Sequence, residues 1–174
     1  MAFILGMGNT VLSFAEYSDV TERDQRLFES NEGFTQSNVE DLLILATDRI
    51  LNKIRASDWW VTYYTRQSGN VSAYVNSVGG LSVPAVDPKK IMNRKQEFTD
   101  LCVYWTLAEY ILPKVADFAN PESAERLKID FYTTKSSMLL TELIQDGDWY
   151  DFDGNGTVTP AEKAPTLLNI RRLR

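Results

Sequence analysis

Apolar residues recur at spacings of three and four in three long stretches of the chain, and this period is typical of helices with one buried face. The first helix is predicted over about 38–56. Ser37 and Glu40 form a capping box at its start, because each side chain can accept a hydrogen bond from the other residue's backbone N–H. Its apolar face is made by Val39, Leu42, Leu43, Ala46, Ile50 and Ile54.

The second helix is predicted to run from Pro88 to about Leu112. Asp87 is a good N-cap, and proline suits the first helical position because the N–H that it lacks has no partner there. Pro113 is expected to end or kink the helix. The apolar face, which would place Cys102 in the core, consists of Phe98, Leu101, Cys102, Trp105, Ala108 and Leu112.

The third helix is predicted to begin at Asn120-Pro121-Glu122, which repeats the same start pattern. Gly147 stands where a C-terminal cap is expected. The apolar positions between these two points are Ala124, Leu127, Phe131, Met138, Leu139, Leu143 and Ile144.

Shorter elements are predicted outside these helices. A strand is expected over 10–14 and a short charged turn of helix over about 22–28. The aromatic and β-branched run 58–65 has the composition of a strand, 67–70 that of a turn, and 71–75 alternates as a second strand does. These three segments together predict a β-hairpin.

The elements predict a mainly α fold: a three-helix, bundle-like domain with a β-hairpin insertion and extended termini. The 174 residues contain no internal repeat and no interdomain linker. We therefore expect one domain over 1–174, with a helical core at about 37–147, a loop at 151–162 and a C-terminal arm at 163–174.

The composition excludes several classes of site. The chain contains no histidine, which removes Ser-His-Asp and Cys-His catalysis and His-ligated zinc. Its single cysteine, Cys102, cannot form an intramolecular disulfide. The 18 Lys and Arg residues against 24 Asp and Glu give a net charge of −6. This charge argues against extensive electrostatic binding to the phosphates of nucleic acid.

No membrane or export segment is expected from the sequence. The uncharged stretch from Met1 to Ala15 is shorter than the roughly 18 apolar residues that a spanning helix needs. It also lacks the positive start of a signal peptide. We expect the chain to stay in a reducing, cytoplasm-like compartment.

The sharpest local pattern is the segment 151–162, which fits the EF-hand calcium loop at each diagnostic position. Gly156 at the sixth position permits the sharp turn. The predicted ligands are Asp151, Asp153, Asn155, the backbone carbonyl of Thr157, Thr159 directly or through water, and Glu162. Because such oxygen ligands bind hard cations, the predicted cofactor is a structural calcium ion.

The same residues also favour a turn without metal. Thr159 and Glu162 form a capping box, and Asp-Gly-Asn-Gly is good turn chemistry. Pro165 interrupts the helix that would follow the loop, and the sequence offers no second loop to pair with this one. If calcium binds, we therefore expect it to fix local geometry rather than to transmit a signal.

Two further groups of residues are candidates for partner binding. The first group lies in the predicted hairpin and consists of Trp59, Trp60, Tyr63 and Tyr64. Exposed rings would suit an interface, and the other interpretation is that these rings pack on the helices. The second group lies at the C-terminus and consists of Arg171, Arg172, Leu173 and Arg174. Arginines favour bidentate pairs with a carboxylate-rich partner, and the other interpretation is a solvated tail.

Patterns within the second and third helices indicate a family. The second helix contains Leu107-Ala108-Glu109-Tyr110, and the third begins with Arg126-Leu127-Lys128, continues through Tyr132, and ends with Leu139-Leu140 before glycine. In this order the chain resembles the small head-to-tail connector proteins of tailed bacteriophages, also called adaptor or head-completion proteins. The resemblance covers roughly Thr35 to Gly147, and the aromatic hairpin and the calcium-type loop depart from it.

The resemblance implies a structural virion protein that is not an enzyme. Members of this family form a homo-oligomeric ring, usually twelve-fold, which joins the portal to the neck or tail and through which DNA only passes. C-terminal segments dock on the portal protein, and other loops contact the next neck or tail protein. The implied location is the virion, assembled in the host cytoplasm. The alternative function is a calcium-dependent protein-binding module built on 151–162, and a metal-and-carboxylate enzyme is a more remote third.

Overall fold

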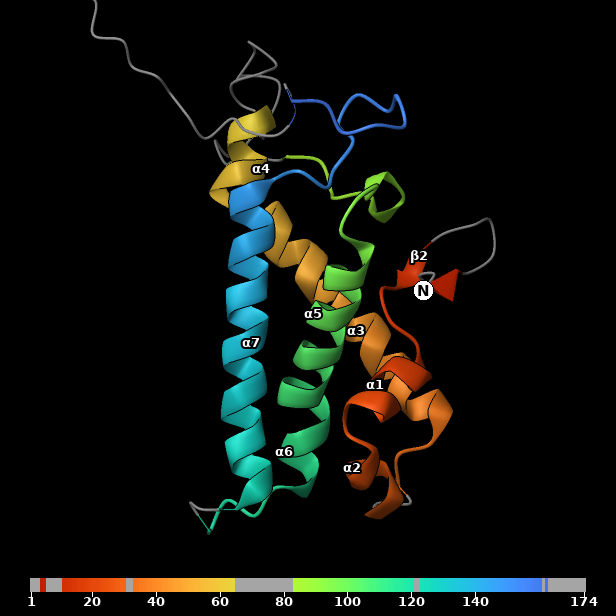
Figure 1. Cartoon of the computed structure of the whole chain (residues 1–174), viewed down its shortest axis with the longest axis vertical. Coiled ribbons are helices and arrows are strands. Elements are labelled where there is room, and N and C mark those ends of the chain that lie inside the picture. The colour runs from red at the N-terminus through yellow and green to blue at the C-terminus, as the bar shows by residue number, and fades with distance from the viewer. Residues whose placement is uncertain are drawn as a thin grey trace, which may run out of the picture. The chain divides into compact units, whose positions relative to one another are not determined.

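The computed structural model describes residues 4–5, 11–30, 33–64, 83–120, 123–160 and 162. These residues are mainly helical, which confirms the predicted fold class (Figure 1). They divide into two compact units: 1–50 with 94–142, and 51–93 with 143–174. The single domain expected from the sequence stays a prediction, because two of the long helices continue from one unit into the other.

The first unit contains most of the regular structure. Its elements are β1 (Ile4–Leu5), β2 (Val11–Ser13), α1 (Tyr17–Arg23), α2 (Gln25–Ser30), most of α3 (Gln36–Arg55), α5 (Lys95–Thr106), the π-helical segment η5 (Leu107–Ile111), α6 (Leu112–Val115) and most of α7 (Ala124–Asp146). β1 and β2 pair antiparallel, with Ile4 opposite Ser13. The strand predicted over 10–14 and the helical turn near 22–28 are thus present as β2 and as α1 with α2.

The core of the first unit lies between α3, α5 and the segment that follows β2. The Phe14 and Phe98 rings are 5.2 Å apart, and the hydroxyl of Thr47 accepts a hydrogen bond from the Phe14 N–H at 3.1 Å. Cys102 is fully buried, as predicted, with its sulfur 3.4 Å from the Thr47 hydroxyl. The helix α7 joins this unit through Tyr132, whose ring stacks on Tyr104 at 5.7 Å.

The predicted helix from Pro88 to Leu112 is interrupted. Asp87 does cap a turn at Pro88, accepting from the Lys89 N–H at 3.0 Å, but that turn is the short 3₁₀ helix η4 (Pro88–Lys90). Ile91 then takes an extended conformation, and α5 begins only after Arg94, whose φ is +57°. The prediction of one continuous helix was wrong because pairing of Ile91 with another segment stops the helix after one turn.

Pro113 disturbs the helix as expected, but without ending it at once. Proline has no N–H to bond four residues back, so the ladder of α-helical hydrogen bonds cannot pass through it unchanged. The chain adopts the π-helical segment η5 directly before Leu112, and α6 then continues to Val115. A π segment at this point lets the helix absorb the missing donor.

The ends of α3 and α7 differ slightly from the predicted caps. α3 starts at Gln36, and the Thr35 hydroxyl accepts from the Asn38 N–H at 3.4 Å, so Thr35 takes the capping position predicted for Ser37. α7 starts after Ser123 rather than at Asn120. Its C-terminal cap is Gly147 as predicted, with φ of +56° and a hydrogen bond from its N–H to the Leu143 carbonyl at 3.1 Å.

The segment predicted as the first strand of a hairpin is helical. Residues 58–62 form α4 (Asp58–Thr62), capped by Ser57, whose hydroxyl accepts from the Trp60 N–H at 3.3 Å. The prediction relied on aromatic and β-branched composition, whereas the local Ser-Asp start favours a helix. The second predicted strand, 71–75, lies outside the described residues.

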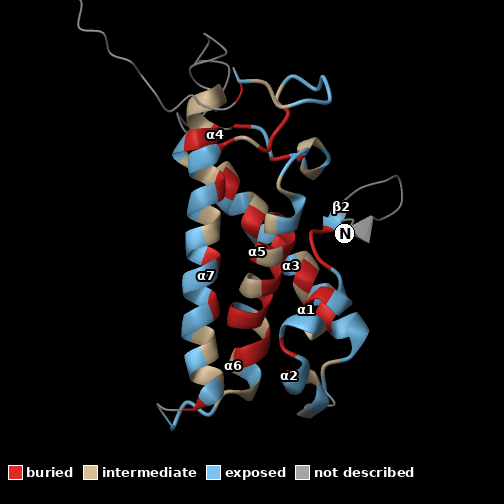
Figure 2. Ribbon diagram, in the orientation of Figure 1, coloured by how far each residue is buried: buried red, intermediate tan, exposed pale blue. Residues whose placement is uncertain are grey.

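Burial differs sharply between helices of the first unit (Figure 2). α5 and the π-helical segment after it carry many buried positions, whereas α7 is exposed along much of its length. Four residues that the sequence placed on the packing face of α7 are instead exposed: Ala124, Leu127, Phe131 and Met138. Among the described residues, none of the helices combines the length and the apolar character that crossing a bilayer requires.

Candidate metal centre

The loop 151–162 belongs to the second unit and begins at a short stretch of backbone pairing. Ile91 and Tyr150 form an isolated antiparallel bridge. The next residue, Asp151, donates its N–H to the Lys90 carbonyl at 3.0 Å. The 3₁₀ turn η4 therefore holds the first residue of the loop and sets the direction in which the loop leaves the pairing.

The carboxylate of Asp151 accepts hydrogen bonds from the tight turn of the loop. Its Oδ1 accepts from the N–H of Gly154 at 2.8 Å and of Asn155 at 3.3 Å, and its Oδ2 accepts from the Gly156 N–H at 2.8 Å. Gly156 has φ of +86°, and a Cβ added there would meet no atom within 4 Å. Glycine is therefore required at the sixth position by its backbone conformation and not by lack of space.

Glu162 ties the two ends of the loop together. Its Oε1 accepts from the N–H of Phe152 at 2.7 Å and of Asp153 at 3.1 Å. Its Oε2 accepts from both the N–H and the hydroxyl of Thr159, at 2.7 and 2.8 Å. The bond to the Thr159 N–H is half of the capping box that the sequence predicts. The Glu162 carboxylate is therefore compatible both with a calcium loop and with a turn without metal.

Three carboxylates of the loop converge. One oxygen from each of Asp151, Asp153 and Glu162 lies within 4.8 Å of the other two, with Asp151 and Glu162 buried and Asp153 exposed. Burial by itself raises the pKa of Asp151, but hydrogen bonds from Gly156 and Gly154 outweigh it and lower that pKa overall.

The pKa of Glu162 is lowered in the same way, by hydrogen bonds that outweigh its burial and come chiefly from Thr159. Both buried carboxylates of the loop are therefore ionised at neutral pH. Concentrated negative charge on oxygen atoms is the environment that a hard divalent cation prefers.

The other predicted ligands support these carboxylates. Asn155 donates its side-chain N–H to Asp153 Oδ2 at 2.8 Å, and its Oδ1 accepts from the N–H and the hydroxyl of Thr157 at 2.8 and 2.7 Å. Thr159 is bound to Glu162, as described above. The structure thus gathers the three acidic ligands at one point and links the amide and hydroxyl side chains to them by hydrogen bonds.

Lys90 is a residue of this site that the sequence did not indicate. Its Nζ donates to the Phe152 carbonyl at 3.2 Å and lies 3.7 Å from the position that a Cβ would take on Gly154. A positive charge therefore already lies beside the loop. Nothing in the spacing of residues 90 and 152 predicts this contact, because it depends on the backbone pairing of Ile91 with Tyr150.

The second position of the loop is anchored in an aromatic cluster of the second unit. We define the aromatic cluster as Trp59, Trp60, Tyr63, Tyr64, Trp149, Tyr150 and Phe152. The Phe152 ring stacks on Tyr63 with centroids 3.5 Å apart and planes 14° apart, and its centroid is 5.3 Å from that of Trp59. Any change in the loop backbone at Phe152 would therefore disturb packed rings.

The predicted partner-binding residues fall into two groups. Trp59 and Trp60 are only 2% and 0% exposed, so these two rings are buried within the protein and are not presented to a partner. Tyr63 and Tyr64 are half-buried. The C-terminal candidates, Arg171, Arg172, Leu173 and Arg174, lie outside the described residues.

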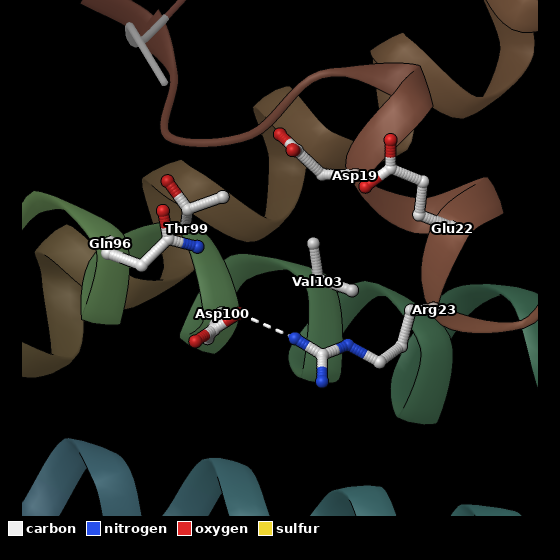
Figure 3. A pocket seen from close by; sticks show the side chains of 7 residues that line it. All are labelled: Asp19, Glu22, Arg23, Gln96, Thr99, Asp100 and Val103. Carbon is white, nitrogen blue, oxygen red and sulfur yellow. Dashed lines mark hydrogen bonds and ion pairs between the residues drawn. The ribbon is translucent and has the colours of Figure 1, made fainter.

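A separate cavity of about 380 Å³ lies in the first unit between α1 and α5 (Figure 3). It is lined by Asp19, Glu22, Arg23, Gln96, Thr99, Asp100 and Val103. Arg23 pairs with Asp100 at 2.6 Å, and Asp19 accepts from the Glu16 N–H at 2.9 Å in the capping box of α1. Polar groups around this cavity therefore hold α1 in place, which is a structural role.

Comparisons of the chain with models of protein families, with curated proteins and with solved structures find no significant match.

Proposed function

We propose that this protein is a structural assembly subunit, and that its assembly is the ring joining the portal to the neck or tail of a tailed bacteriophage. The observation that carries the assembly role is a row of large apolar side chains on α7. Leu127, Phe131 and Met138 are 60%, 54% and 54% exposed. Single exposed apolar residues are ordinary, whereas several on one helix are typical of a protein contact surface.

The choice of a phage connector rests on the resemblance of the helices. Three long helical segments follow one another in the order that the resemblance implies, and Gly147 caps the last of them. The leucine-alanine-x-tyrosine pattern lies in the π-helical segment before Pro113. These features support the connector role, and the portal-docking function of the C-terminal arm remains part of the proposal.

Binding to a portal protein tests this role directly. The full chain, co-expressed with the portal protein encoded in the same genome, should co-purify with it, and electron microscopy should show several copies around the portal axis. A chain lacking residues 166–174 should keep its helical content by circular dichroism but lose the portal. Failure of the full chain to bind the portal would contradict the connector role.

We also propose that the loop binds calcium as a brace for the second unit. The three convergent carboxylates carry this proposal, because they supply oxygen ligands of the kind that calcium takes in proteins. Glu162 already accepts four hydrogen bonds, two at each oxygen. Its bidentate binding to calcium would therefore require that some of the bonds to Phe152, Asp153 and Thr159 be released or shared.

Calorimetric titration with calcium chloride tests the brace. The wild-type protein should release or absorb heat with a one-to-one end point, and terbium should show luminescence sensitised by the aromatic cluster. Glu162→Gln should abolish both signals, while the control Glu142→Gln, an exposed carboxylate on α7, should leave them unchanged. Equal titrations for Glu162→Gln and wild type would exclude the loop as the site.

Removal of calcium by a chelator separates the connector from the alternative function. A calcium-dependent binding module is favoured by one observation, the stacking of Phe152 on the half-buried Tyr63, which couples the loop to rings near the surface. A module of this kind would lose its partner when calcium is chelated. A connector with a calcium brace should keep the portal under the same conditions, although its second unit unfolds at a lower temperature.

A further inference from the structure

The cavity between α1 and α5 is lined by carboxylate oxygens that the fold does not use (Figure 3). Asp19 is the clearest case, because the residue is only 8% exposed. Its Oδ2 accepts from the Glu16 N–H at 2.9 Å, whereas its enclosed Oδ1 has no hydrogen-bond partner among the described residues. An enclosed carboxylate oxygen without a donor is unfavourable, so this position favours a ligand that brings a donor.

Two further acidic residues of the same cavity have oxygens available. Glu22 is exposed and stands one helical turn after Asp19 on α1, and its carboxylate has no ion pair or hydrogen bond within the described part of the chain. Asp100 uses its Oδ1 for the ion pair with Arg23 at 2.6 Å, which leaves its Oδ2 for a ligand. Three carboxylates against one guanidinium give the lining an excess of negative charge.

The spread of these carboxylates favours an organic cation over a metal ion. Within the described ranges, the one group of three acidic side chains close enough together to hold an ion is that of Asp151, Asp153 and Glu162. The acidic side chains of the cavity instead surround a space of about 380 Å³, which lies in the range of pockets for small organic molecules. A molecule with two separated positive groups matches both the size and the charge of this space.

The available oxygens also indicate which cationic group fits. A guanidinium group binds a carboxylate best through two parallel hydrogen bonds, and Asp19 has only one oxygen left for a ligand. An ammonium group donates single hydrogen bonds in several directions, so one ammonium can bridge Asp19 and Glu22. Val103 lines the same cavity with apolar methyl groups and is only 1% exposed. Such a wall suits a short alkyl chain.

We propose that this cavity binds a short aliphatic diamine in its doubly protonated form. One ammonium group bonds to the carboxylates of Asp19 and Glu22, and the other lies beside Asp100. The alkyl chain between them lies against Val103. The Asp19 carboxylate turns slightly on binding, so that Oδ1 reaches the ligand while Oδ2 keeps the Glu16 N–H. All of these residues belong to the first unit, so the site requires neither a portal protein nor calcium.

Nuclear magnetic resonance of the isotope-labelled full chain locates the ligand, with putrescine as the probe. The backbone N–H signals of Asp19 and Val103 should shift and reach saturation at millimolar putrescine. Those of Gly154 and Gly156, in the calcium-type loop, should stay in place. The proposal is wrong if the shifts near the cavity do not saturate, or if the loop alone responds.

Removal of single negative charges tests the contacts. Asp19→Asn keeps an acceptor for the Glu16 N–H but should raise the dissociation constant for putrescine at least about tenfold, because it loses a charged acceptor. Glu22→Gln has no described contact to lose and should raise the constant about threefold, because the carboxylate is exposed. The matched control is Asp48→Asn, an exposed carboxylate on α3, which should leave the constant unchanged. Wild-type affinity in both Asp19→Asn and Glu22→Gln overturns the proposal.

Competition at constant ionic strength separates a diamine site from general attraction of cations. Cadaverine, which also has two ammonium groups on an alkyl chain, should displace putrescine from the cavity. Tetramethylammonium chloride has the charge but no N–H donor, and magnesium chloride needs convergent oxygens, so neither should displace it at the same concentration. If either salt displaces putrescine as well as cadaverine does, the cavity selects only for charge and the proposal is wrong.

Discussion

The two compact units build their interiors from different kinds of side chain. The first unit is made of regular helices, and its fully buried residues are mostly aliphatic, as Leu43 and Leu101 illustrate. The second unit has short helices and irregular segments, and three of its largest buried residues are tryptophans: Trp59, Trp60 and Trp149. The difference shows how an interior adapts to the backbone that surrounds it.

The physical reason lies in the hydrogen bonds of the backbone. A long helix satisfies its own N–H and C=O groups, so its interior needs only apolar volume. Irregular segments and the last turns of helices leave carbonyl groups that can accept a side-chain donor. In the second unit Trp60 donates its Nε1–H to the Pro84 carbonyl at 2.9 Å, and Trp149 donates to the Leu143 carbonyl at 2.7 Å. Trp60 and Trp149 thus fill the interior and donate to a backbone carbonyl at once.

Removing one of these tryptophans should give the largest effect. Trp149→Ala should lower the free energy of unfolding by about 3–5 kcal/mol, because a fully buried ring leaves a cavity. Trp149→Phe should cost about 1 kcal/mol, because the hydrogen bond from the ring N–H to the Leu143 carbonyl is lost while the Gly147 N–H still binds that carbonyl. Denaturant unfolding measures both, with Leu45→Ala as an exposed control expected to change stability by less than about 0.5 kcal/mol. If Trp149→Phe has the same free energy of unfolding as wild type, the role assigned to the ring N–H is wrong.

Acid should act on the second unit through the loop carboxylates. The pKa values of Asp151 and Glu162 are lowered in the folded protein, so both contribute stability above their ordinary values near pH 4. That contribution should disappear as the pH falls below about 4, through the lowered values. Tryptophan fluorescence followed against pH measures the change.

Two aspartates provide the comparison for the acid experiment. Asp151→Asn should lose part of the pH dependence, because its side chain no longer ionises. Asp48→Asn, an exposed position on α3, should behave as wild type. If Asp151→Asn and wild type lose fluorescence over the same pH range and to the same extent, the loop carboxylates are not what acid removes.

Lys90 should have a smaller effect, on metal affinity. Its ammonium group lies beside the loop, and a positive charge at that distance opposes a cation. Lys90→Gln should therefore raise calcium affinity by about threefold in calorimetry at low salt, and less at high salt. Lys89→Gln, on the same 3₁₀ turn, is the matched control and should change affinity little. Weaker binding by Lys90→Gln would mean that Lys90 supports the loop more than it repels the ion.

The smallest effect is expected at Cys102 in the first unit, where the thiol should not react with a thiol reagent. Burial raises the pKa of its thiol to about 11, while hydrogen bonding to Thr47 partly opposes this. At pH 8 only about one thiol in a thousand would be ionised, and the sulfur is buried. Ellman's reagent should leave the native protein unmodified for hours and react fully in denaturant. Fast reaction of the native protein would mean that the helical unit opens more readily than its packing indicates.

Several features of this protein could be predicted from its sequence because short stretches of chain decide them. Gly147 caps α7 because a residue with positive φ must follow the helix, and glycine adopts that conformation at little cost. The carboxylates of Asp151 and Glu162 converge because the turn between them is encoded by Gly156 and the residues around it. The amphipathic pattern of α3 determined its length to within a few residues.

Other features were decided only when distant segments met. The run after Ser57 has the composition of a strand, yet it is helical, and its rings contact Phe152 almost a hundred residues later. Ile91 leaves the helical conformation because it pairs with Tyr150. A periodic pattern predicts that a helix has an apolar face, but it does not predict which apolar residues are buried in the folded chain. In α7 only the tertiary structure decided that Tyr132 is buried and that Phe131 is exposed.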